Sequence, residues 1–217
     1  MKDEWGIWAN RLFRKRGMVA ERFWTFHSKL LCWYWDIKIG KNCKFWGKTH
    51  FNRAPHSTIH VGAHCRFRSA FWSNLVGINR PCMLSTLRPN AKIMIGDHSG
   101  FSGTVISAAE SISIGKNVLC GANVTITDTN WHHIVQSICQ DTPVLTDAVT
   151  ICDNVWLAMN VIVLKGVRIG PNSVVAANSV VTRDIPENVL AAGQPAKIIK
   201  QISTGCKETD QYKSNLF

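Results

Sequence analysis

Two adjacent histidines stand in a short polar stretch that could carry out proton transfer. The stretch reads Asp128-Thr129-Asn130-Trp131-His132-His133. Histidine titrates close to neutral pH, so it commonly acts as the general base that removes a proton from a hydroxyl or an amine. A carboxylate or a backbone carbonyl must then hold its second ring nitrogen, and Asp128 is the candidate. The pattern indicates general-base chemistry by one of the two histidines, His132 or His133.

A period of six residues runs through the chain that follows. Every sixth residue is aliphatic in the series Leu145, Ile151, Leu157, Val163, Ile169, Val175 and Val181. Four places later, small or β-branched residues recur at Val149, Val155, Val161, Val167, Ser173 and Ser179. Three places after the first series stand Ala148, Asn154, Asn160, Gly166, Asn172 and Asn178. Asn and Gly tolerate the positive φ of a tight corner.

This period predicts a mainly β protein, a parallel β-helix built from hexapeptide repeats. Six residues make one strand and one corner, three such units close a triangular coil, and coils stack at about 4.8 Å. An α-helix would instead need apolar spacings of three and four, and an amphipathic strand a spacing of two. The first two series should point inward. Less regular copies of the repeat extend the predicted β-helix over residues 39–184.

Three segments depart from the repeat. Residues 127–144 form an excursion loop that holds both histidines, and loops that leave a solenoid usually carry function. Residues 1–38 are rich in Trp, Phe, Lys and Arg, and a helix is predicted from about Trp5 to Trp35. It could cap the first coil or lie on a membrane surface with aromatic anchors and a basic face. Residues 185–217 are predicted to leave the solenoid after Pro186 as a C-terminal extension.

Charge and cysteine content narrow the partners and the compartment. The net charge of +11 favours an anionic partner, either nucleic acid, a membrane surface or a phosphate-bearing molecule. Nucleic acid ranks lowest because no finger, RNP or helix-turn-helix pattern occurs. The eight cysteines form no CxxC pair and no zinc spacing, so we expect buried thiols in a reducing compartment. With no signal peptide and no long apolar run visible, we expect the cytoplasm, including the inner face of the membrane.

The C-terminal part resembles the hexapeptide-repeat acyltransferases. Residues 151–202 read ICDNVWLAMNVIVLKGVRIGPNSVVAANSVVTRDIPENVLAAGQPAKIIKQI. This is similar to bacterial surface-polysaccharide O-acetyltransferases of the colanic-acid and lipopolysaccharide type, and more distantly to galactoside and maltose acetyltransferases. Cys152 and Ala158 stand where the family usually has Gly, and both are small. The resemblance implies a left-handed coil and a homotrimer with its active-site cleft between subunits.

The resemblance also implies acetyl-CoA as cosubstrate, no metal, and direct transfer of the acetyl group to a sugar hydroxyl of a surface polysaccharide or its precursor. His132 best matches the catalytic histidine of the family, often written D-x-D-x-H, although Asn130 stands where Asp is frequent. A backbone N–H near Ala158 or Met159 would stabilise the oxyanion. The implied CoA contacts are Trp156 in the cleft, Ala158 and Ala177 beside the pantetheine arm, Thr182 and Arg183 flanking the nucleotide, and Lys197 and Lys200 near its phosphates.

Other functions remain open. The chain could be an N-acetyltransferase of an amino-sugar nucleotide, or a non-catalytic β-helix scaffold, against which the histidine loop and the CoA-like tail argue. A zinc site like that of the hexapeptide-repeat carbonic anhydrases is disfavoured because the histidine spacing differs. His64 and His98 occupy the corner position that Asn fills in other repeats, so we interpret them as corner residues.

Overall fold

The computed structural model describes residues 3–133 and 144–203. The helix α1 (Glu4–Tyr34) comes first, and the carboxylate of Asp3 caps it by accepting a hydrogen bond from the Gly6 amide at 2.8 Å. Short strands follow, with one 3-10 turn, η1 (Phe71–Ser73), between them. None of the helices within the described ranges is long and apolar enough to cross a bilayer.

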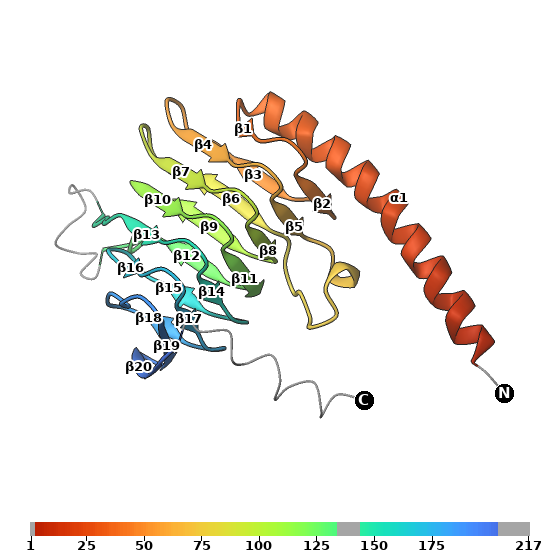
Figure 1. Ribbon diagram of the computed structural model, residues 1–217. Helices are drawn as coiled ribbons and strands as arrows, with labels where there is room; N and C mark the ends of the chain where they lie inside the picture. The colour runs from red at the N-terminus through yellow and green to blue at the C-terminus, as the bar shows by residue number, and fades with distance from the viewer. Residues whose placement is uncertain (1–2, 134–143, 204–217) are drawn as a thin grey trace.

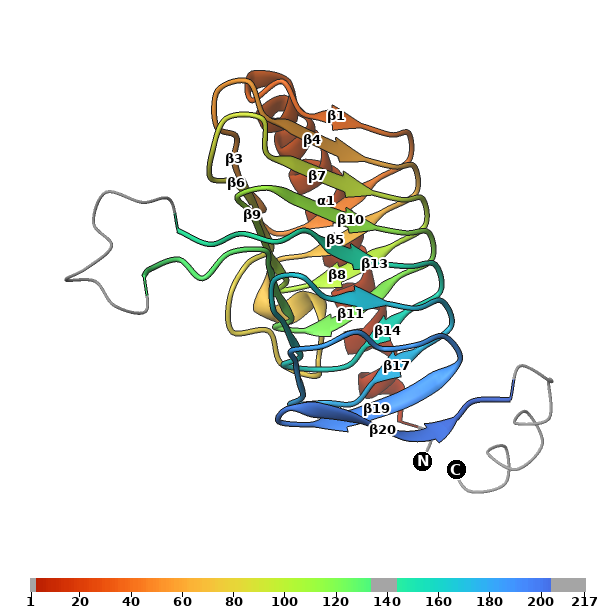
Figure 2. The ribbon, with the colours of Figure 1, turned by 90° about the vertical axis from the view of Figure 1, so that its left-hand side faces the viewer.

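The strands form three sheets that wrap around one interior, and successive strands pass from sheet to sheet (Figures 1 and 2). Sheet A holds β1 (Lys38–Ile39), β4 (Thr58–Val61), β7 (Lys92–Ile95), β10 (Ser111–Ile114), β13 (Val149–Ile151) and β16 (Arg168–Ile169). Sheet B holds β2 (Lys44–Trp46), β5 (Arg66–Arg68), β8 (Gly100–Ser102), β11 (Leu119–Ala122), β14 (Trp156–Leu157), β17 (Val174–Val175), β19 (Val189–Gly193) and β20 (Ala196–Gln201). Sheet C holds β3 (His50–Asn52), β6 (Met83–Thr86), β9 (Val105–Ala108), β12 (Thr125–Thr127), β15 (Ile162–Val163) and β18 (Val180–Val181). Neighbouring strands within each sheet are parallel up to β19, so the chain forms the parallel β-helix that the repeat predicts.

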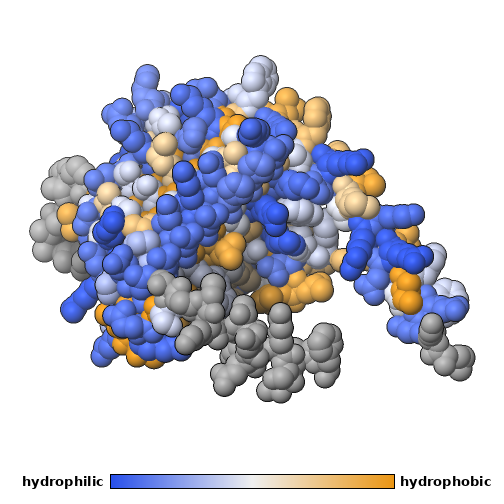
Figure 3. Space-filling model, viewed as in Figure 1, coloured by the Kyte–Doolittle hydropathy of each residue, from blue (hydrophilic) through white to orange (hydrophobic). Residues whose placement is uncertain are grey.

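The helix α1 lies where the sequence predicts one, and only its C-terminal half packs on the coils. Ser28 and Cys32 are buried, and the Thr25 hydroxyl accepts a hydrogen bond from the Phe45 amide at 3.0 Å. This half covers the first coil, as expected of a cap. The N-terminal half projects away from the coils, and hydrophobic and hydrophilic residues lie side by side on its surface (Figures 1 and 3).

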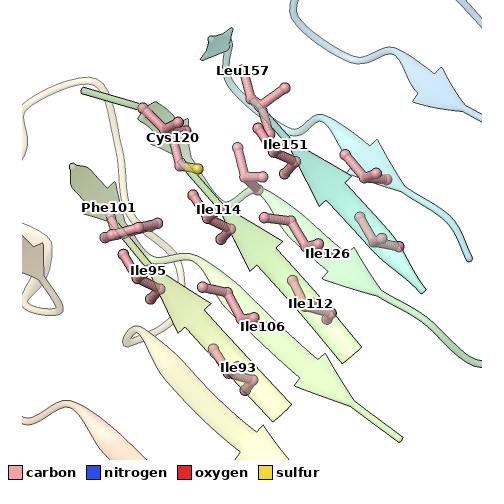
Figure 4. Packing of buried hydrophobic residues seen from close by; sticks show 14 of the residues in the cluster. Ile93, Ile95, Phe101, Ile106, Ile112, Ile114, Cys120, Ile126, Ile151 and Leu157 are labelled. Atoms are coloured by element: carbon pink, nitrogen blue, oxygen red, sulfur yellow. The ribbon is translucent and has the colours of Figure 1, made fainter. Parts of the chain in front are cut away.

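The interior is a set of aliphatic columns, one residue for each coil. In sheet A, Ile95, Ile114 and Ile151 are in register, as Figure 4 shows. Both predicted inward series are at most 1% exposed from Val149 onward. Leu145 is 64% exposed, so its placement in the core was wrong. It precedes the first uninterrupted coil and lies at the base of the excursion loop.

Asparagines form ladders at two corners of the triangle. Asn154, Asn160, Asn172 and Asn178 have φ between 57° and 60°, as predicted, whereas Ala148 does not share the positive φ. The side-chain amides link successive coils, with Asn154 donating to Asn172 at 3.0 Å and Asn172 to Asn188 at 2.9 Å. His64 and His98 also have positive φ, and their rings stack at 4.6 Å, which confirms their interpretation as corner residues.

Replacing Asn172 by Ala is expected to lower the free energy of unfolding by about 2 kcal/mol. Alanine at positive φ costs about 1–2 kcal/mol, and the amide bonds to both neighbours are lost as well. Asn172→Gly loses the same hydrogen bonds without the steric strain, so it should destabilise less. Urea unfolding followed by circular dichroism measures both variants, and equal losses would contradict the strain argument.

The solenoid ends later than predicted. Beyond residue 184, β19 pairs with β17 in parallel, and Val189 and Ala191 are fully buried beneath it. Only β20 then turns back, as an antiparallel partner of β19 that closes the last coil. The stretch after Pro186 therefore contributes one more strand to sheet B before the chain leaves the coils.

The thiols are buried, as expected, and none is in a disulfide among the cysteines that the structure describes. Cys32, Cys43, Cys65, Cys82 and Cys120 are buried, and Cys152 is half-buried. Burial raises the pKa of the Cys32 thiol to about 12, so this side chain stays neutral at physiological pH. Cys139 and Cys206 lie outside the described residues.

Candidate active site

The histidines stand on a short stalk that leaves the coil where sheet C passes into sheet A, an edge that we call the C–A edge. Thr129 and Thr146 form an antiparallel bridge, and the Asn130 amide donates to the Leu145 carbonyl at 3.2 Å. The Asp147 amide donates to the Asp128 carbonyl at 3.0 Å. These bonds tie the two described arms of the excursion, residues 127–133 and 144–147, together, and both arms project from the side of the β-helix (Figure 2).

A tight turn at Trp131 presents the first histidine to solvent. Trp131 has a φ of 64°, and its indole N–H donates to the Thr127 hydroxyl at 3.1 Å. The His132 amide donates to the Asn130 carbonyl at 2.8 Å. The His132 side chain is exposed and that of His133 is half-buried. The turn thus anchors Trp131 to the coil and leaves the His132 side chain exposed.

Asp128 does not meet His132 in the part of the chain that the structure describes. Its carboxylate is fully buried and accepts hydrogen bonds from the amides of Ala109 at 2.6 Å and Glu110 at 2.8 Å. Burial raises the pKa of this carboxyl above its ordinary value, and the amide donors act in the opposite direction. Asp128 therefore fastens the root of the stalk to the neighbouring coil, and its predicted contact with the His132 imidazole is not formed.

Replacing Asp128 by Asn is expected to lower the free energy of unfolding by about 1–3 kcal/mol. The new amide nitrogen would face one of the two backbone donors, which leaves a buried N–H without an acceptor. Urea unfolding measures the loss. Asp147→Asn, on the exposed arm of the same stalk, is the matched control and should leave the midpoint unchanged. Equal stability of both variants would show that the carboxylate does not hold the stalk.

Four predicted CoA contacts gather where sheet B passes into sheet C, which we call the B–C edge. Trp156 is 50% exposed on β14, between Leu119 of β11 and Val174 of β17. Ala158 and Met159 follow it at the corner. One coil later Ala177 occupies the equivalent corner, directly beneath Met159 in the register of these sheets. Small side chains thus line one edge beside an exposed indole.

The remaining predicted contacts lie elsewhere on the same chain. Lys197 and Lys200 are exposed on β20, at the C-terminal end of sheet B. Thr182 and Arg183 follow β18 and lie on the C–A edge, which is the edge that carries the stalk. One chain therefore does not bring Thr182, Arg183 and His132 together with Trp156.

The choice of oxyanion donor narrows to one amide. The Ala158 N–H donates to the Val175 carbonyl at 2.9 Å, as part of the ladder between coils, so it is not available for a substrate. The Met159 carbonyl accepts from the Asn178 amide at 2.9 Å. The Met159 N–H donates to no acceptor within residues 3–133 and 144–203, which leaves it as the candidate.

Comparison with known proteins agrees with this geometry. Residues 148–183, which supply the six strands β13 to β18 of the regular coils, match the family described as bacterial transferase hexapeptide (six repeats). This segment carries the hexapeptide repeat of that family. This confirms the predicted resemblance and the left-handed parallel β-helix that it implies.

Relatives of this hexapeptide-repeat protein include two O-acetyltransferases. It is 36% identical over 143 residues to the galactoside O-acetyltransferase of Lactococcus lactis. This match covers 66% of the chain and 63% of that protein. It is 43% identical over 104 residues to the putative lipopolysaccharide biosynthesis O-acetyl transferase WbbJ of Escherichia coli. This match covers 44% of the chain and 53% of that protein. The chain thus spans about half to two thirds of the length of these relatives.

A solved structure shares the fold of this hexapeptide-repeat protein. A variant of AntD, an N-acyltransferase from Bacillus cereus in complex with dTDP-4-amino-4,6-dideoxyglucose and coenzyme A, superposes with a TM-score of 0.63. The match covers 81% of this chain and 89% of that one at 20% identity. At this identity the likeness concerns the fold alone.

Sequence reasoning missed a second loop at the B–C edge of the hexapeptide-repeat protein. Residues 69–82 leave the coil there, and Arg80 ties them back by donating to the Asn123 carbonyl at 2.7 Å and the Thr125 hydroxyl at 2.7 Å. The loop presents Leu75 and Val76, which are 89% and 67% exposed. The apolar residues Leu75 and Val76 stand in a break of the hexapeptide repeat, and this pattern could have predicted an exposed loop.

A groove between α1 and sheet B was also not predicted. Its volume is about 690 Å³, and its lining includes Lys44, Arg66 and the stacked imidazoles of His64 and His98. The groove follows the outer face of sheet B as far as Leu119, the neighbour of Trp156. No group of three or more His, Cys, Asp or Glu side chains suited to a metal ion occurs in the described part of the hexapeptide-repeat protein.

Proposed function

We propose that this protein transfers the acetyl group of acetyl-CoA to a hydroxyl of a sugar in a surface polysaccharide or its precursor. The observation that carries the proposal is the hydrogen-bonded stalk that holds an exposed imidazole, His132, on a hexapeptide β-helix. The corner of this β-helix at Met159 offers an amide N–H that has no acceptor among the described residues. The O-acetyltransferase relatives support the reaction type.

In this mechanism the protein supplies a base and an oxyanion donor. The His132 imidazole takes the proton of the acceptor hydroxyl while the hydroxyl oxygen attacks the thioester carbonyl. The Met159 N–H donates to the resulting oxyanion. The carbon–sulfur bond then breaks, and the imidazolium returns its proton to the departing thiolate. No covalent bond to the protein forms.

We propose a homotrimer as the active form, because the two halves of the candidate site lie on different edges of one chain. His132, Thr182 and Arg183 are on the C–A edge, whereas Trp156 and Met159 are on the B–C edge. Joining the C–A edge of one subunit to the B–C edge of the next would complete a cleft. Lys197 and Lys200 would then meet the phosphates of CoA.

We assign a separate role to each of three segments of the chain. Residues 39–184 with the loop 127–144 form the catalytic unit, residues 185–217 close it and contribute the two lysines, and residues 1–38 lie apart from the reaction. The free thiols and an acetyl-CoA donor both favour the reducing cytoplasm, including the inner face of its membrane, as the place of action.

The test is release of CoA thiol from acetyl-CoA in the presence of candidate acceptors. Galactosides and other neutral sugars should support release, and the acetyl product should be lost in mild alkali, as an ester is. An alkali-stable product made from an amino-sugar nucleotide would favour the N-acetyltransferase alternative. A protein that neither binds CoA nor releases thiol with any acceptor would be a scaffold, and the proposal would fail.

A further inference from the structure

An exposed apolar stripe follows the whole length of α1. Its members recur at spacings of three and four, with one gap of seven between Leu12 and Val19, which places them on one side of a helix with 3.6 residues per turn. They are 42–80% exposed: Trp5, Trp8, Leu12, Val19, Phe23, Phe26, Leu30 and Trp33. We call this set the outer stripe.

The outer stripe points away from the β-helix. The side of α1 that packs on the coils carries Trp24, Ser28 and Cys32, of which Ser28 and Cys32 are at most 1% exposed. At 100° for each residue, this side is opposite the outer stripe. The apolar surface therefore has no role in capping the first coil.

Cations border the outer stripe. Arg11, Lys15, Arg22 and Lys29, spaced by four and seven, form a row along one border, and Arg16 lies on the other. The helix has two carboxylates, at Glu4 and Glu21, and Glu21 pairs with Lys44 at 3.3 Å on the packed side. The projecting surface of α1 thus combines apolar side chains with cationic ones, and Figure 3 shows hydrophobic and hydrophilic residues side by side along this helix.

We propose that α1 binds the surface of an anionic lipid bilayer through the outer stripe. Aromatic and aliphatic side chains enter the boundary between headgroups and acyl chains, and the bordering cations meet lipid phosphates. A second copy of the helix fits less well. The outer stripe is interrupted between Leu12 and Val19 by Lys15 and Arg16, which a helix–helix seam would bury but which can extend their charges to headgroups at a bilayer.

The test uses the full-length protein and co-sedimentation with vesicles. It should bind vesicles of phosphatidylglycerol with phosphatidylcholine at least about tenfold more tightly than vesicles of phosphatidylcholine alone, and added salt should weaken the binding. The variant Trp5→Ser/Trp8→Ser should bind at least about tenfold more weakly. Arg11→Gln/Lys15→Gln/Arg22→Gln should lose roughly fivefold for each cation on the anionic vesicles.

The matched control is Phe71→Ser/Leu75→Ser, which removes two side chains that are 80% and 89% exposed but lie off the helix. It should bind vesicles as the unaltered protein does. Absence of binding to anionic vesicles, or equal binding by the Trp5/Trp8 variant, would overturn the proposal. The proposal would also fail if the unaltered protein did not bind vesicles and the Trp5/Trp8 variant sedimented as a smaller assembly. The outer stripe would then be a contact between subunits.

Discussion

The variant His132→Ala is expected to lose about a hundredfold or more in the turnover of acetyl transfer, because general-base catalysis contributes a factor of that size. The affinity for CoA should not change. The His132 side chain is exposed, and its imidazole forms no hydrogen bond with residues 3–133 or 144–203. Thiol release at saturating acetyl-CoA measures the first quantity, and calorimetric titration with CoA measures the second.

The neighbouring histidine provides the control for this prediction. His133→Ala removes the same group one residue further along, where the side chain is half-buried, and should leave turnover within about threefold of the original, since it lies outside the proton path. Full activity of His132→Ala together with a large loss in His133→Ala would exchange the two roles. Full activity in both variants would show that neither histidine of this loop is the general base.

The repeat predicts the coils well because every hexad has the same structural requirements. An inward aliphatic side chain and a residue that tolerates positive φ are needed once per corner, so both patterns are visible in the sequence. The prediction fails at Leu145 and Ala148, where the chain returns from the stalk. There the bridge between Thr129 and Thr146, and not the period, decides which side chain is buried.

The site could be predicted only in part, because hydrogen bonds between coils join residues that spacing does not relate. Asp128 reaches the amides of Ala109 and Glu110, and the Ala158 amide meets the Val175 carbonyl. Residue type suggested a catalytic carboxylate and an oxyanion donor, but the ladder between coils uses both groups. The late end of the solenoid has a similar cause. Ile185 pairs with Ile169 and Ala191 with Val175 at separations of 16 residues, where Leu157 and Val175 are 18 apart, so the last coil is out of step with the period of six.

A column of three phenylalanines fills the N-terminal coils, where the repeat is least regular. Phe67 is fully buried, and its ring stacks on Phe45 at 4.9 Å and on Phe101 at 5.0 Å. All three project inward from sheet B, at the position that Cys120 and Leu157 hold in the following coils. Since the coils can stack only if each interior is filled, the column substitutes for the aliphatic residues of the regular repeats.

The variant Phe67→Ala is therefore expected to lower the free energy of unfolding by about 3–5 kcal/mol, since it leaves a cavity between two coils that the backbone ladder holds apart. Phe67→Leu fills most of that space and should cost clearly less. The control Phe71→Ala removes a ring that is 80% exposed four residues away and should change stability by no more than about 0.5 kcal/mol. Urea unfolding followed by circular dichroism compares the three. Similar midpoints for Phe67→Ala and Phe71→Ala would mean that the N-terminal coils are not closely packed, and that the helix cap and the backbone ladders alone hold them together.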